Sequence, residues 1–219
     1  MATPKTPVRK APAVSNKPVV ASEADPQSWL YLNPTGPSSS GLVFGVLRKH
    51  YGGRSNSAAE FGWRKAHPVR PAGNIGESPW IVTAERLEVI LPEGADDSLA
   101  DPELLLRQMD ACAIDCEKAL LVYLTLPLGD AERIHAGWEL ARAFVREHIA
   151  RDRELATVMA LHSPGRIGSA NPLHCHCLIV PRRLTGRGLS HGPYDAELIT
   201  DGGQAVVEAM WAEHLGTFR

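Results

Sequence analysis

The chain has 219 residues, of which 44% are hydrophobic and 22% charged, which is enough for one sizeable domain with an apolar core. No apolar run approaches the roughly 20 residues of a membrane-spanning helix, and the N-terminus lacks the apolar segment of a secretory signal. We therefore expect a cytoplasmic protein without a membrane span.

The four cysteines fall into two close pairs. Cys112 and Cys116 lie one helical turn apart, and Cys175 and Cys177 share one side of a predicted strand. Neither pair has the C-x-x-C spacing typical of zinc sites. Buried, reduced thiols are the expectation, with zinc binding by the four cysteines as the alternative.

Charge is distributed unevenly around a net value of −2. Residues 43–72 hold six lysines or arginines against one acid, whereas residues 93–117 hold eight acids against one base. A second basic cluster contains Arg182, Arg183 and Arg187. This pattern favours one basic face suited to phosphates, although an ordinary solvated surface produces similar runs.

The N-terminal part of the chain, residues 1–26, has the composition of a disordered segment. Residues 1–26 hold five prolines and four lysines or arginines, and we predict a disordered basic tail followed by one domain over 27–219. Residues 29–32 then resemble a short strand, and 34–41 a turn rich in Gly, Pro and Ser.

Strand and helix patterns alternate through the rest of the chain. Apolar residues at helical spacing predict a helix over 42–51 that Gly52 and Gly53 end, followed by a long loop over 54–78. The later pattern predicts strands at 86–91, 120–126, 155–161 and 174–180 and helices at 102–117, 131–150 (capped by Asp130) and 206–215. Because the strands at 155–181 can pair as a hairpin, this order predicts a single α+β sandwich.

Three histidines form the clearest chemical motif. His174 and His176 alternate on one strand and so share a face, and His162 ends the preceding strand, from which it can meet them across the hairpin. Three imidazoles that converge with coordination positions left open suit a divalent cation that also binds substrate. The alternative is two partly exposed strand histidines and one in a turn.

Tyr51 is the candidate nucleophile. It follows Arg48 and Lys49 and precedes Arg54, and nearby cations favour ionisation of a phenol, whose ordinary pKa is near 10. An ordinary tyrosine at a helix end is the alternative interpretation.

The histidine segment resembles the metal motif of the MobA/MobL relaxases. The segments that carry the resemblance are Val158-Met-Ala-Leu-His162-Ser-Pro and Asn171-Pro-Leu-His174-Cys-His176-Cys-Leu-Ile-Val-Pro-Arg182-Arg183. Weaker similarity precedes them at Trp29-Leu-Tyr-Leu, at Tyr51, at Gly73-Asn74-Ile75 through Trp80, at Leu87 to Pro92 and at Glu117 to Pro127. The resemblance spans roughly residues 28–190.

The resemblance implies an HUH relaxase-like sandwich, in which helices flank an antiparallel central sheet. It implies that His162, His174 and His176 hold a divalent metal ion (Mn, Mg or Zn) and that Tyr51 attacks a phosphodiester of single-stranded DNA at a transfer origin, forming a tyrosyl link in plasmid mobilisation. Phosphate contacts are then expected from Arg54, Arg182 and Arg183, and accessory mobilisation proteins are expected as partners.

Two other functions stay open. Histidine-triad nucleotide hydrolases also alternate histidines on a strand, but Leu178 and Pro172 occupy the places where a further alternating histidine would stand. A non-catalytic DNA-binding accessory protein of mobilisation or replication is the other alternative, and the negative net charge favours it.

Overall fold

A six-stranded antiparallel sheet forms the centre of the protein, with strand order β1-β2-β6-β8-β7-β5. The computed structural model describes residues 26–69, 80–184, 186 and 188–217, and the predicted tail at 1–26 lies almost wholly outside them. In the order of the sheet, the strands are Tyr31–Leu32, Val43–Leu47, Leu121–Pro127, His174–Arg183, Leu155–His162 and Arg86–Ile90.

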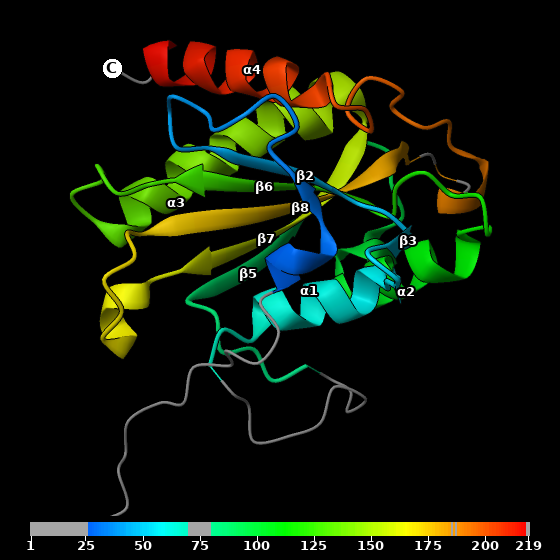
Figure 1. Ribbon diagram of the computed structural model, residues 1–219, viewed down its shortest axis with the longest axis horizontal. Helices are drawn as coiled ribbons and strands as arrows, with labels where there is room; N and C mark the ends of the chain where they lie inside the picture. The colour runs from blue at the N-terminus through cyan, green and yellow to red at the C-terminus, as the bar shows by residue number, and fades with distance from the viewer. Residues whose placement is uncertain (1–25, 70–79, 185, 187, 218–219) are drawn as a thin grey trace, which may run out of the picture.

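Helices cover both faces of this sheet (Figure 1). On one face lie α1 (Ala58–Ala66) and α2 (Pro102–Cys112), and on the other lie α3 (Ile134–Phe144), the π-helical η3 (Val145–Arg151) and α4 (Gly203–Thr217). Each face of the sheet has its own cluster of buried apolar side chains. The expected α+β class, an antiparallel central sheet flanked by helices, is confirmed.

Short elements complete the fold. The 3-10 helices are η1 (Pro26–Trp29), η2 (Asp97–Ala100), η4 (Pro164–Ile167) and η5 (Leu189–His191). A separate two-stranded hairpin joins β3 (His50–Tyr51) to β4 (Arg54–Ser55).

The helix predicted over 42–51 is wrong, because this segment contains β2 and β3. The β2 side chains are almost all buried, since the strand lies inside the sheet with helices on both faces. A strand buried on both faces has a continuous apolar run without alternation, which periodicity does not distinguish from a buried helix. Gly52 and Gly53 do not end a helix but form the two-residue turn of the β3–β4 hairpin, with φ of 60° and 77°.

The long loop predicted over 54–78 is also wrong in its first half, which contains β4 and α1. Ser57 caps α1 through its hydroxyl, which accepts from the Glu60 amide at 3.1 Å. The Asp110 carboxylate of α2 accepts from the amides of Ala58 at 2.6 Å and Ala59 at 3.0 Å. One of the groups that cap the N-terminus of this helix therefore lies some 50 residues away in the sequence.

Two later helices are shorter than predicted. The helix at 102–117 ends at Cys112, and the one at 131–150 begins at Ile134, with Arg133 rather than Asp130 at its N-cap. The predicted strands at 86–91, 120–126, 155–161 and 174–180 are confirmed within a few residues.

The cysteines are all free, and the two pairs differ in exposure. Cys175 and Cys177 are fully buried, as expected, whereas Cys112 is half-buried and Cys116 is exposed. Among the described residues, no helix has the length and apolarity needed to cross a membrane.

Candidate metal centre

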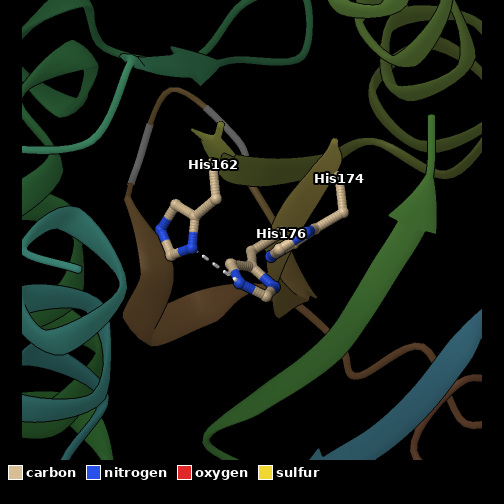
Figure 2. Close-up of side chains that lie close together, drawn as sticks. All are labelled: His162, His174 and His176. Atoms are coloured by element: carbon tan, nitrogen blue, oxygen red, sulfur yellow. Dashed lines mark hydrogen bonds between the residues drawn. The ribbon is translucent and has the colours of Figure 1, made fainter. Parts of the chain in front are cut away.

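The β7–β8 hairpin brings the three histidines together. His162 pairs with His174 in the register of the two strands, and His176 lies two residues further along β8, opposite Ala160. The three rings point toward one another (Figure 2). They lie on the face of the sheet where α1 packs, since His162 contacts the backbone of Lys65 in α1. One ligand nitrogen from each ring lies within 4.8 Å of the other two.

The outward nitrogens of two of these histidines are fixed by backbone carbonyls. The Nε2–H of His162 donates to the Lys65 carbonyl oxygen at 2.6 Å, and the Nδ1–H of His174 donates to the Pro172 carbonyl oxygen at 2.8 Å. A carbonyl only accepts, so these bonds assign the proton in each neutral ring. The lone pairs of His162 Nδ1 and His174 Nε2 are thereby left for the centre of the cluster.

His176 is held by two hydroxyl groups on β6. Its Nδ1 lies 2.8 Å from the Tyr123 hydroxyl and 3.1 Å from that of Thr125, while its Nε2 lies 3.2 Å from His162 Nδ1. Hydroxyls both donate and accept, so this network supports either tautomer of His176. When the proton of His176 lies on Nδ1, the lone pair of its Nε2 points to the centre of the cluster, together with those of His162 Nδ1 and His174 Nε2.

Burial keeps the three imidazoles neutral. Desolvation is the largest cause that lowers the pKa of each ring: that of His162 falls to about 4, and those of His174 and His176 fall below the ordinary 6.5. The neighbouring Lys65 charge lowers all three further. Neutral imidazole is the form that binds metal ions.

The donor set fits a divalent cation. Imidazole nitrogens bound tetrahedrally to one ion at roughly 2.1 Å lie about 3.4 Å apart. The 3.2 Å between His162 Nδ1 and His176 Nε2 is close to that spacing. Ligating histidines also typically donate their other N–H to a carbonyl or another polar group, as these do.

A hollow of about 240 Å³ lies beside His162. Its wall includes Thr83, Glu85, Ser163 and Arg166, and the Arg166 guanidinium pairs with the Glu85 carboxylate at 3.0 Å. The side chain of Arg166 remains 63% exposed. A polar group bound at the histidines therefore has room and a nearby cation.

Tyr51 is not brought to the histidines. His174 pairs with Pro127 at one end of β6, which we call the histidine end of the sheet, whereas Leu47 pairs with Leu121 at the opposite end. The seven-residue strand from Leu121 to Pro127 spans roughly 20 Å, and Tyr51 lies beyond Leu47. In Figure 1, β3 accordingly lies at the other end of the sheet from the β7–β8 turn.

The other three tyrosines, which all lie within the described residues, do not take the place of Tyr51 as an exposed nucleophile at the histidines. Tyr31 contacts Tyr51, with ring centroids 6.4 Å apart, and Tyr194 forms a bridge with Arg182 near the far end of β8. Tyr123 does adjoin His176, but its side chain is fully buried. None of the four therefore presents an exposed hydroxyl at the three histidines.

The three arginines expected to contact DNA also lie away from the histidines. Arg54 belongs to the β3–β4 hairpin, and Arg182 and Arg183 end β8, nearly its whole length from His174. All three pair with carboxylates, at 2.8 Å for Glu60, 3.0 Å for Glu117 and 3.6 Å for Glu154 respectively. Phosphate contacts beside the histidines do not fit these positions.

Four further residues lie at this site without any motif in the sequence that marks them: Lys65, Tyr123, Thr125 and Arg166. Tyr123 and Thr125 alternate on a strand, a pattern that marks a shared face but not the residue opposite it. Lys65 is 94% buried, although its segment was expected to be a loop. Only the register and the position of α1 place these residues at the histidines.

Comparison with known proteins finds similarity among solved structures. No model of a protein family matches the chain, and no curated protein matches it. Among solved structures, the chain is similar to one described as "Molecular Basis of Vancomycin Resistance Transfer in Staphylococcus aureus", with 20% sequence identity and a TM-score of 0.48 over 62% of this chain and 72% of that chain. At this level the likeness assigns no activity, and the interpretation of the site rests on the geometry of its three histidines.

Proposed function

We propose that the chain is a relaxase-type domain of plasmid mobilisation, in which His162, His174 and His176 hold a divalent cation that binds a phosphodiester of single-stranded DNA for strand cleavage. The cation would supply Lewis-acid polarisation of the phosphate and stabilise charge on its oxygens. The resemblance of the histidine segment to the MobA/MobL motif supports the choice of DNA as substrate.

One observation carries the proposal. The outward nitrogen of every histidine has a polar partner at 2.6–2.8 Å, namely the carbonyls of Lys65 and Pro172 and the hydroxyl of Tyr123. These bonds aim the inner nitrogens at a common point, and the two carbonyls fix the tautomers of His162 and His174 that a metal ion requires. An ordinary set of surface histidines has no reason to satisfy all three outer nitrogens in this way.

The ligand type favours some cations over others. Three imidazoles suit zinc or manganese better than magnesium, which prefers oxygen ligands and retains its waters. Three protein ligands also leave coordination positions open for substrate, as in catalytic rather than structural zinc sites.

The geometry gives no support to Tyr51 as the attacking group. We therefore propose cleavage by water: its oxygen forms a new bond to phosphorus, one phosphodiester P–O bond breaks, and the products are a phosphate and a hydroxyl end without a tyrosyl link. Among the described residues, Lys65, whose charge acts on His162, and Arg166, which lines the hollow beside it, would assist in binding the phosphate.

A second candidate is DNA binding without cleavage, as in a mobilisation or replication accessory protein. The observation that favours it is the fully buried state of Tyr123, the one tyrosine at the site. In that case the metal ion and DNA would still bind together at the histidines. Only an analysis of the DNA products distinguishes binding alone from binding followed by cleavage.

The test uses the full chain with labelled single-stranded DNA from the neighbourhood of its own gene. Binding is followed by fluorescence anisotropy with manganese or with a chelator, and products are separated by denaturing electrophoresis. We expect manganese-dependent binding and cleavage that His174→Ala abolishes and that His135→Ala, which removes an exposed histidine of α3, leaves unchanged.

The remaining outcomes decide between the alternatives. A covalent protein–DNA adduct that Tyr51→Phe removes would overturn hydrolysis and restore tyrosyl transfer. Metal-dependent binding without any cleavage would establish the accessory function. Binding that neither the chelator nor His174→Ala affects would refute a role for the cation altogether.

A further inference from the structure

A second group of metal-ligand side chains lies on the opposite face of the sheet. Glu147 and His148 belong to η3, and His214 belongs to α4, whose backbone lies beside α3 and η3 in Figure 1. One ligand atom from each of these three residues lies within 4.8 Å of the other two. No part of the proposed DNA chemistry uses this group.

His214 is oriented in the same way as the histidines of the first centre. Its Nε2–H donates to the Leu140 carbonyl oxygen at 3.1 Å, so in the neutral ring the lone pair lies on Nδ1. That Nδ1 lies 3.6 Å from Glu147 Oε2. A lone pair and a carboxylate at this separation repel each other unless a proton or a metal ion lies between them.

The position of His148, the third residue of the group, favours a metal ion rather than a proton between His214 and Glu147. A proton would join His214 to Glu147 alone, whereas the His148 ring also turns toward His214, with centroids 5.4 Å apart. A nitrogen and an oxygen bound tetrahedrally to one zinc ion lie about 3.4 Å apart, close to the 3.6 Å observed.

The surroundings of this group are apolar on one side and open to solvent on the other. Phe144 packs against both His148 and His214, with ring centroids 5.2 and 5.6 Å apart, and Trp211 stacks on His214. Only 1% of the His214 side chain is exposed, whereas 48% of that of Glu147 is, so one side of the group is open to solvent. The π-helical η3 adds to this picture, because π-helical turns occur frequently at functional sites.

We propose that Glu147, His148 and His214 form a second divalent-metal site, of the zinc class, that joins α4 to η3. Two imidazoles and one carboxylate are a ligand set that zinc accepts, with water in the fourth position. A metal ion there crosslinks segments more than 60 residues apart in the sequence and stabilises the attachment of the C-terminal helix.

The experiment counts bound metal in the full chain. Zinc is titrated calorimetrically, and cobalt is titrated by visible absorption, into wild type and into the double variant Glu147→Gln, His148→Ala. We expect the variant to bind one equivalent fewer than wild type and to lose the rise in melting temperature that zinc gives through this site. Both residues are at least partly exposed, so the variant is expected to fold.

Matched controls separate this site from the first centre. His135→Ala removes an exposed histidine from the neighbouring α3 and should keep full stoichiometry. If the three-histidine centre binds no metal, wild type binds one equivalent and the double variant binds none. The test of the second site therefore does not depend on whether the proposed function is correct. Equal stoichiometry in wild type and the double variant would overturn the second site and leave a proton between His214 and Glu147.

Discussion

At the scale of single residues, the hydrogen bonds behind the histidines determine what the cluster binds. Lys65 and Pro172 contribute carbonyl oxygens, and Tyr123 and Thr125 contribute hydroxyls. A lone imidazole rotates and exchanges its proton between two nitrogens, whereas these contacts fix ring orientation and, for two rings, the tautomer. In the proposed metal site, affinity for the ion would therefore depend on residues that never touch it.

Tyr123→Phe tests this dependence. The substitution removes only the hydroxyl at His176 Nδ1, and we expect zinc or manganese affinity to fall about tenfold, since the loss of an outer partner typically costs 10–100-fold. Calorimetric titration measures the change. Tyr194→Phe, at the other end of the sheet, should leave affinity unaltered. Wild-type affinity in Tyr123→Phe would mean that the Thr125 hydroxyl alone holds His176.

At the scale of elements, the two helices on the histidine face depend on each other. The Asp110 carboxylate of α2 accepts from two amides of the first turn of α1 and, at 2.6 Å, from the Ser57 hydroxyl. A carboxylate at a helix N-terminus satisfies amides without partners in the helix and interacts favourably with the helix dipole. The other end of α1 carries the Lys65 carbonyl that orients His162.

Asp110→Ala should therefore destabilise the fold and weaken the metal site together. We expect the free energy of unfolding to fall by about 1–2 kcal/mol, the usual cost of a lost N-cap, and metal affinity to fall because α1 is held less firmly. Urea denaturation and metal titration measure the two effects. The exposed Glu132→Gln is the control, and a loss in Glu132→Gln as large as that in Asp110→Ala would contradict the role of the cap.

The elements also show why four strands of the sheet were predicted from the sequence, whereas α1 was not. The strands β5, β6, β7 and β8 have local signals, namely apolar runs bounded by proline, glycine or polar residues. The helix α1 depends instead on a distant carboxylate, and its mean hydropathy is low because it contains the charged residues Glu60, Arg64 and Lys65. The local periodicity of the sequence does not reveal the contact between Asp110 and the start of α1, which lies some 50 residues away.

At the scale of the whole molecule, buried neutral histidines connect stability to pH. The folded-state pKa of His162 is about 4, and those of His174, His176 and His214 also lie below the ordinary 6.5. Between these values the unfolded chain binds protons that the folded chain excludes. Stability is thus retained above about pH 6.5 and lost as the pH falls toward about 4.

This loss is measurable in the metal-free protein. With a chelator present, we expect the free energy of unfolding to fall by about 2 kcal/mol from His162 alone between about pH 7.5 and about pH 5. Urea denaturation across this range gives the slope. His135→Ala removes an exposed histidine and should retain the slope; a flat profile in the wild type would contradict neutral, buried rings.

The sequence by itself determined the α+β class and the shared face of His174 and His176, because strand alternation and apolar runs are local properties of the chain. Tertiary structure decided which distant residues reach that face. Strand register carries β2 away from the histidines and so places Tyr51 at the opposite end of the sheet, and α1 then returns the chain and brings Lys65 to His162. The end of the sheet at which a residue lies depends on how the strands pair. Strand pairing is set by long-range packing, which no local sequence pattern contains.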